Sequence, residues 1–211
     1  MDVAKTGWPL PAPTVGLLGG SFNPAHDGHL WISRQALTRL GLHQVWWLVS
    51  PQNPLKPSAG MASQASRIAH AARVASDRRI RVTGLEADLG TVYTADTLPA
   101  LARRFPRTRF VWLMGADNLL QISHWQRWPQ IFHAAVVAVF DRGSYSRQAA
   151  WATGARRFAR QRLSERECHG LAQRQPPQWV LLHIPRHPAS ATALRASGRA
   201  LTDLPQTIDP V

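Results

Sequence analysis

The chain has 211 residues, 45% of them hydrophobic, and carries a formal net charge of +13. This length suits one α/β domain with a substantial core, which we predict to span residues 1–211. Its single cysteine, Cys168, excludes an intramolecular disulfide and a thiolate metal cluster. No apolar run approaches the ~18 residues that a membrane span requires, and the first residues form no apolar signal segment. We therefore expect a cytoplasmic protein that does not bind a membrane.

Arginine accounts for most of the positive charge, with 23 of the 25 basic residues. Such a charge suits a nucleic-acid-binding protein, which is the alternative from a different functional class. A basic surface also attracts polyphosphate substrates, and the arginine bias is consistent with codon composition alone. Since no segment resembles a nucleic-acid-binding module, we expect no nucleic-acid partner.

The first predicted elements are a buried strand at 15–18 and a helix at 30–40 that stops at Gly41, with a glycine-rich segment between them. Glycines let backbone N–H groups approach a phosphate, and a helix N-terminus presents unpaired donors and a partial positive charge. His26 and His29 fall on or beside the first helical turn, where they can donate hydrogen bonds to phosphate oxygens. The segment therefore predicts an anion-binding site.

Two other interpretations of this segment are weaker. His26 and His29 could hold zinc, but structural zinc takes four ligands, and no cysteine or third histidine lies nearby in the sequence. A Walker-type phosphate loop is excluded, because no Gly-Lys-Ser or Gly-Lys-Thr follows the glycines. We expect no dedicated metal site in the protein.

Strand and helix patterns alternate along the rest of the chain. A continuous apolar run at 44–50 predicts a strand buried on both faces. The helix predicted at 62–76 has five apolar residues on its buried side: Ala65, Ile68, Ala69, Ala72 and Ala75. Further strands are predicted at 79–83, 110–114, 135–140 and 179–184, and a helix at 94–104.

This alternation predicts an α/β fold with a doubly wound parallel sheet, helices on both faces and right-handed crossovers. In such sheets ligands bind beyond the carboxyl ends of the strands, and the glycine-rich segment falls at that edge. Residues 1–13 are predicted to form an N-terminal extension, and 186–211 a C-terminal helical segment.

Basic residues crowd the segment 142–174, where the helical pattern weakens. We interpret this segment as a helix with a solvated, arginine-rich face, and Trp151 and Phe158, seven residues apart, as its buried side. A contact face for phosphate, nucleic acid or a partner is the alternative, but no interleaved aromatic residues support base stacking.

A second candidate phosphate site lies near the C-terminus. Ser190 at the start of a helix, with Thr192 and Arg195 downstream, offers two hydroxyls and a fork of N–H donors to phosphates. Taken alone, the serine could equally be a helix cap, so both interpretations stay open.

Several segments together resemble one family. The string Gly-Gly-Ser-Phe-Asn-Pro-Ala-His-Asp-Gly-His at 19–29 resembles the signature of the nucleotidyltransferase superfamily with a His/Thr-x-Gly-His motif. Within it, the chain is similar to the bacterial nicotinate-nucleotide adenylyltransferases at Asn-Pro-Leu-Lys (53–56), Tyr-Thr-Ala-Asp-Thr-Leu (93–98), Gly-Ala-Asp-Asn-Leu through His-Trp (115–125) and Ser-Ala-Thr-Ala-Leu-Arg (190–195). Two departures are Ala189, where the family usually has Ile or Val, and the short chain after Pro205.

The resemblance implies a Rossmann-like nucleotidyltransferase fold and a role for each matched residue. It implies catalytic contacts with phosphates for His26, His29 and Arg195. It implies ATP and phosphate binding for Gly19, Gly20, Ser21, Phe22, Lys56, Ser190 and Thr192. It implies nicotinate mononucleotide binding for Tyr93, Thr94, Asp117 and Trp125, where Asp117 contacts nucleotide hydroxyls and Trp125 stacks on the pyridine ring.

The implied reaction is adenylyl transfer from ATP to nicotinate mononucleotide in NAD biosynthesis, giving deamido-NAD and pyrophosphate. Mg²⁺ is expected on the triphosphate, with water and phosphate oxygens as its ligands. Nicotinamide mononucleotide and phosphopantetheine stay open as other acceptors, although phosphopantetheine enzymes usually carry threonine in place of His26 and lack the 93–98 stretch. A monomer or a weak homodimer fits the sequence.

Overall fold

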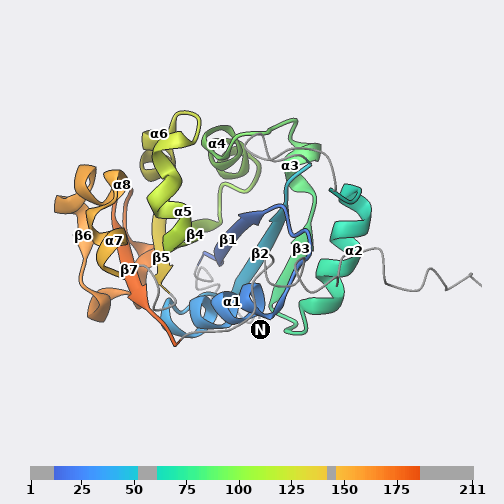
Figure 1. Cartoon of the computed structure of the whole chain (residues 1–211), viewed down its shortest axis with the longest axis horizontal. Coiled ribbons are helices and arrows are strands. Elements are labelled where there is room, and N and C mark those ends of the chain that lie inside the picture. Colours follow the sequence, from blue (N-terminus) through green and yellow to red (C-terminus); the bar gives the residue numbers. More distant parts are fainter. Residues whose placement is uncertain (1–11, 52–60, 142–145, 186–211) are drawn as a thin grey trace, which may run out of the picture.

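The computed structural model describes residues 12–51, 61–141 and 146–185. Seven strands form one sheet in the order β3-β2-β1-β4-β5-β7-β6, and every strand pair is parallel. The strands are β1 (Thr14–Gly20), β2 (Gln44–Val49), β3 (Ile80–Thr83), β4 (Arg109–Gly115), β5 (Val136–Asp141), β6 (Arg162–Leu163) and β7 (Trp179–His183). The chain starts in the middle of the sheet, runs outward to β3 and then crosses to β4 (Figure 1), which confirms the doubly wound arrangement.

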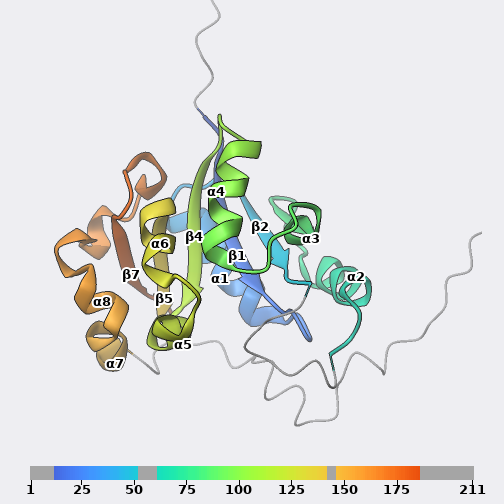
Figure 2. The same cartoon turned by 90° about the horizontal axis from the view of Figure 1, so that it is seen from above.

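Helices cover both faces of the sheet. Figure 1 shows α1 (Asp27–Arg39) below the sheet and α4 (Thr94–Arg104) above it, and Figure 2 looks onto the face that carries α4. The remaining helices are α2 (Gln64–Val74), α3 (Leu85–Asp88), α5 (Ala116–Gln121), α6 (Trp128–Ala134), α7 (Ser146–Trp151) and α8 (Thr153–Arg157). α1 begins three residues before the predicted start, because its first turn carries the histidines rather than apolar residues.

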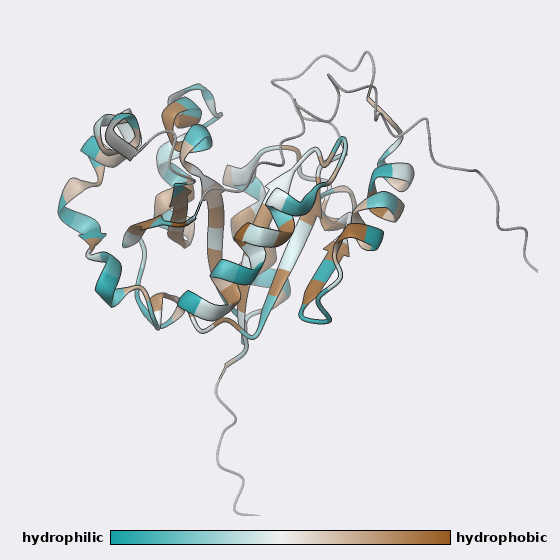
Figure 3. Cartoon of the chain, turned by 60° about the horizontal axis from the view of Figure 1, so that its bottom comes forward, coloured by the Kyte–Doolittle hydropathy of each residue, from teal (hydrophilic) through white to brown (hydrophobic). Residues whose placement is uncertain are grey.

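Each face of the sheet has its own hydrophobic core. α1 and α2 pack with Leu113 on one face, whereas α4, α5 and α6 pack with Trp112 on the other. The two neighbouring residues belong to different cores because successive side chains of a strand point to opposite faces. The strands are accordingly the most hydrophobic part of the chain, beneath more polar helices (Figure 3).

The central strand β1 passes between these cores with little room for side chains. A Cβ atom on Gly16 would lie 2.7 Å from Leu113 Cδ1, and one on Gly19 would lie 2.4 Å from Trp112 Cη2. Both separations are too short for real contacts, so a side chain at either position would force its neighbour to move, and the rigid Trp112 ring makes Gly19 the stricter requirement.

The buried face of α2 differs from the prediction. Ala65, Ala69 and Ala72 are exposed, whereas Arg67 and Ala71 are buried. The predicted face follows apolarity, but the Arg67 side chain turns inward because backbone carbonyls accept its hydrogen bonds. The buried side of the helix is therefore shifted by one residue.

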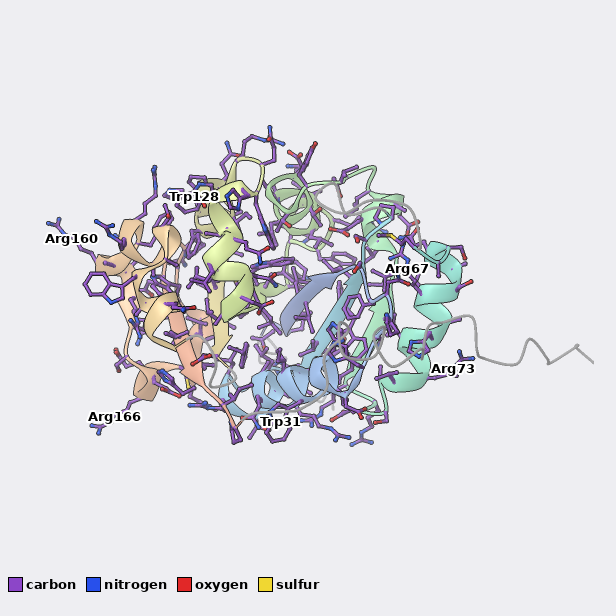
Figure 4. All side chains as sticks on the ribbon, in the orientation of Figure 1. Trp31, Arg67, Arg73, Trp128, Arg160 and Arg166 are labelled. Carbon is purple, nitrogen blue, oxygen red and sulfur yellow. The ribbon has the colours of Figure 1, made fainter. Side chains whose placement is uncertain are left out.

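The segment 142–174 is not one helix. α7 and α8 are short and meet at Ala152, whose extended backbone (φ −57°, ψ 148°) interrupts the helix. Because of this break, Trp151 and Phe158 do not share a face: Trp151 is 76% exposed, which contradicts the prediction, while Phe158 is buried as expected. Arg160 and Arg166 are exposed and point away from the protein (Figure 4), in agreement with a solvated arginine-rich surface.

No helix among the described residues is both long and apolar enough to cross a membrane. The cytoplasmic location stays a prediction. The predicted N-terminal extension falls almost entirely, and the C-terminal helical segment entirely, outside the described residues, so these boundaries also stay predictions.

Candidate active site

The starts of α1, α4 and α5 lie at the carboxyl edge of the sheet. α1 follows β1, α5 follows β4 directly, and α4 follows β3 after the short α3. A helix N-terminus carries unpaired N–H groups and a partial positive charge, so this edge favours anions. The edge gathers the predicted site residues that the structure describes: Gly19, Gly20, Ser21, Phe22, His26, His29, Tyr93, Thr94, Asp117 and Trp125.

The two histidines are locked by the backbone at the start of α1. His26 is the N-cap, and its Nδ1 accepts a hydrogen bond from the Gly28 N–H at 3.1 Å. The His29 Nδ1 accepts one from the His26 N–H at 3.2 Å, and the two ring centroids are 3.9 Å apart. Because Nδ1 is the acceptor in both rings, the proton of each neutral imidazole is on Nε2. The Nε2–H group of each ring therefore lies at the helix N-terminus.

An aromatic ring packs against His29, and a hydroxyl group donates to its carbonyl. The buried Phe22 ring lies 4.7 Å from the His29 ring and stacks on Trp47 at 5.1 Å. Trp47 Nε1 donates to Ser33 Oγ at 2.7 Å, and Ser33 Oγ donates to the His29 carbonyl at 2.8 Å. Neither Ser33 nor Trp47 is predicted from the sequence, although the i+4 spacing of Ser33 from His29 is a usable signal.

Phe22 is more deeply buried than the three residues that precede it. Gly19, Gly20 and Ser21 are half-buried, whereas Phe22 as a whole residue is 2% exposed. Its backbone is in the left-handed region with φ 47°. Because the ring is buried in the core, the predicted phosphate contact of Phe22 can come only from its backbone N–H.

A second group of site residues surrounds the start of α4. Tyr93 is the N-cap, 40% exposed, and no side chain caps the helix, so Thr94 is not a cap. The buried Thr97 hydroxyl lies 3.2 Å from the Tyr93 carbonyl, 3.0 Å from Thr91 Oγ1 and 3.3 Å from Glu86 Oε1. Burial raises the pKa of Glu86 to about 7, and the hydrogen bond from Thr97 opposes this shift only in part. This buried network was not predicted.

Asp117 folds back over the turn that precedes α5. A Cβ atom on Gly115 would lie 2.2 Å from Asp117 Oδ1, so only glycine leaves room for the carboxylate in this position. The Gly-x-Asp spacing of the sequence thus has a steric cause.

Trp125 is half-buried at the end of the 3₁₀ turn that follows α5. An ion pair joins Asp96 in the first turn of α4 to Arg127, two residues after Trp125. It brings the Tyr93–Thr94 segment beside the Trp125 segment, as the predicted pyridine-nucleotide site requires. Both partners are exposed, so the pair adds little stability.

The other predicted site residues are not described. Lys56, Ser190, Thr192 and Arg195 lie outside the described ranges, and their roles stay predictions. No group of three His, Cys, Asp or Glu residues in the described part of the chain could hold a metal ion. The predicted absence of a dedicated metal site is not tested by this result.

A groove in the described surface lies at the other end of the strands. It has a volume of about 890 Å³ and is lined by Pro13, Arg109 and Val136, which precede or begin β1, β4 and β5. The groove is therefore at the amino edge of the sheet, opposite the histidines.

The sequence profile of the cytidylyltransferase-like family matches residues 17–197. The chain is 50% identical over 188 residues to the probable nicotinate-nucleotide adenylyltransferase of Parvibaculum lavamentivorans, covering 89% of this chain and 94% of the relative. It is 48% identical over 192 residues to the protein of the same name from Gluconobacter oxydans, covering 91% and 98%. The fold is similar to that of Plasmodium falciparum nicotinic acid mononucleotide adenylyltransferase complexed with NaAD, with a TM-score of 0.64, 15% identity, and 87% and 83% coverage. The chain belongs to the nicotinate-nucleotide adenylyltransferase family.

Proposed function

We propose that this protein transfers the adenylyl group of ATP to nicotinate mononucleotide, forming deamido-NAD and pyrophosphate in NAD biosynthesis. The observation that carries the proposal is the placement of His26 and His29, both held by backbone N–H groups, at the N-terminus of α1 beside the glycine-rich turn. Relatives about 50% identical to the chain are named probable nicotinate-nucleotide adenylyltransferases, which supports the same reaction.

The reaction needs no protein nucleophile. A 5′-phosphate oxygen of nicotinate mononucleotide attacks the α-phosphorus of ATP in line, the bond from that phosphorus to the bridging oxygen breaks, and pyrophosphate leaves. Catalysis then consists of positioning the two phosphates and stabilising their negative charge. His26 and His29 donate to the oxygens undergoing transfer, and the backbone N–H groups of 19–22 bind the neighbouring phosphate. Lys56, Ser190, Thr192 and Arg195 would hold the departing pyrophosphate.

Mg²⁺ fits this site as part of the ATP substrate. The groups beside the glycine-rich turn are imidazole and backbone N–H groups, which bind phosphate oxygens, and the carboxylate among the predicted site residues, Asp117, lies on a different element, α5. Mg²⁺ keeps several water ligands and binds substrate phosphates readily, so the triphosphate and water would hold it. When bound, it offsets part of the triphosphate charge.

The start of α4 suits an acidic pyridine substrate. Accepting the nicotinate carboxylate requires N–H donors, and a helix N-terminus supplies them at Tyr93 and Thr94. Trp125 would stack on the ring, and Asp117 would accept hydrogen bonds from nucleotide hydroxyls. These contacts favour the acid over its amide.

Pyrophosphate release tests the proposal directly. ATP and Mg²⁺ are offered with nicotinate mononucleotide, nicotinamide mononucleotide or phosphopantetheine in separate reactions. A strong preference for the nicotinate substrate is expected. Preference for another acceptor would keep the reaction and overturn the substrate. If no acceptor gives pyrophosphate release, the proposed enzymatic function is contradicted. The salt dependence of nucleic-acid binding would then test the alternative of a nucleic-acid-binding protein.

A further inference from the structure

Arg67 is a charged side chain inside the core. It points inward from the middle of α2 and is 1% exposed, whereas Arg73 on the same helix points outward (Figure 4). Four backbone carbonyls accept its hydrogen bonds: Ala62 from Nε at 2.9 Å, Ser21 and Ser50 from Nη1 at 2.6 and 2.8 Å, and Pro51 from Nη2 at 3.0 Å. No carboxylate among the described residues pairs with it.

The four carbonyls belong to three separate segments at the carboxyl edge of the sheet. Ser21 is in the glycine-rich turn after β1, Ser50 and Pro51 follow β2, and Ala62 leads into α2. Pro51 and Ala62 also lie on either side of the sequence 52–60, which contains Lys56. A single planar guanidinium therefore connects the glycine-rich turn after β1 to the residues on both sides of the segment 52–60.

Such an arrangement is costly for stability. A buried cation without a counter-charge loses its hydration, and burial accordingly lowers the pKa of the Arg67 guanidinium. An apolar side chain would avoid that cost but would leave the four carbonyls without their donor. Residues that break a rule of local stability tend to lie at functional sites, and Arg67 is next to the turn that carries the predicted phosphate contacts.

The Ser21 carbonyl shows what the hydrogen bond achieves. This carbonyl and the Phe22 N–H belong to one planar trans peptide unit, so they point in opposite directions. Because the carbonyl points to the buried guanidinium, the Phe22 N–H points away from it. The Phe22 side chain is buried, so this N–H is the group through which Phe22 can bind a phosphate.

We propose that Arg67 is a positioning residue for adenylyl transfer: it fixes the Ser21–Phe22 peptide so that the Phe22 N–H faces the ATP phosphates. The inference rests on the proposed function. Arg67 itself does not touch the substrate, and it acts through the peptide that it orients.

Kinetics of Arg67→Lys and Arg67→Met test the proposal. Lysine keeps the positive charge but lacks the planar fork of N–H donors. Methionine has a similar volume but neither the charge nor the donors. We expect kcat/KM for ATP to fall by about 10–100-fold in both variants, since a small misplacement of a binding group costs this much. The KM for nicotinate mononucleotide should change by less than about twofold, a difference of under ~0.4 kcal/mol, because Tyr93 and Trp125 are placed by elements on the other face of the sheet.

Arg39→Lys is the matched control. Arg39 also donates to a backbone carbonyl, that of His183, but it lies at the opposite end of α1 from the glycine-rich turn. We therefore expect the kinetic constants of this variant to be unchanged. A purely structural role for Arg67 would lower the melting temperature of its variants and leave kcat and both KM values of the folded protein unchanged. That result overturns the proposal.

A measurement on the wild-type protein covers the case in which both variants fail to fold. Addition of tripolyphosphate should shift the backbone amide NMR signal of Phe22 more than that of the buried Leu101, and no shift at Phe22 overturns the proposal. Failure of the proposed function looks different: the wild type would release no pyrophosphate, while the Phe22 signal would still report phosphate binding.

Discussion

His29 is held by three different contacts. Its Nδ1 accepts the His26 N–H, its ring lies against Phe22, and its carbonyl accepts from Ser33. His29→Ala removes one phosphate donor and leaves the scaffold, so kcat/KM should fall by at least ~10²-fold, or about 2.7 kcal/mol of transition-state stabilisation. Pyrophosphate release from ATP and nicotinate mononucleotide measures this. The exposed His133 on α6 provides the control, and His133→Ala should keep wild-type activity. Near-normal turnover by folded His29→Ala would remove His29 from the site.

Glu86 makes the stability of the protein depend on pH. Burial raises its pKa from 4.5 to about 7, so the folded state holds this proton more tightly than the unfolded state does between these values. The contribution of the neutral carboxyl is complete below about pH 4.5 and is lost as the pH rises through about 7. The free energy of unfolding should fall by about 3 kcal/mol across this window.

Glu86→Gln removes this titration. We expect the variant to be more stable than the wild type at about pH 8 and the two proteins to converge at about pH 4, because only the wild type must bury an ionised group at high pH. Urea unfolding at several pH values measures the difference. Parallel stability profiles of the two proteins would show that Glu86 does not titrate in this way.

Among the elements, the β4–α5 turn depends most directly on one missing side chain. In Gly115→Ala the new Cβ would collide with the Asp117 carboxylate, which must then move. We expect the KM for nicotinate mononucleotide to rise about tenfold or more, a loss of about 1.4 kcal/mol, with a smaller effect on ATP. Gly84, the N-cap of α3, is a matched control, since its Cβ would meet the flexible Ile68 side chain at 3.1 Å. Equal effects of the two substitutions on KM would contradict the role of Asp117.

α2 shows why the buried face of a helix can differ from its apolar face. Alanine gains little from burial, so the positions Ala65, Ala69 and Ala72 exert only a weak preference. Four hydrogen bonds to one guanidinium are stronger, and they turn Arg67 inward. The apolar pattern correctly predicted a helix with Ile68 and Ala75 packed against the core, but not that Arg67 is buried.

At the scale of the whole molecule, β1 must pass between two cores. Gly19→Ala should destabilise the protein by about 1–3 kcal/mol, because its Cβ would meet the rigid Trp112 ring. Gly16→Ala should cost less, since Leu113 can change its side-chain conformation. Urea unfolding compares the two. A double variant with Trp112→Leu should lose less than the sum of its parts, because the smaller side chain relieves the clash. Additive losses would contradict a direct contact.

The sequence by itself determined the parallel α/β fold and the glycine-rich turn before α1. Strand runs, helical periods, glycines and helix ends are local signals, and His26, Gly28 and His29 interact within three residues of one another. Only the tertiary structure decided the roles of Arg67, Glu86 and Gly19. The partners of Arg67 lie as far as 46 residues away, and Gly19 meets a ring from a neighbouring strand. Burial of a charge and steric contact between strands depend on which elements pack together, and no local pattern carries that information.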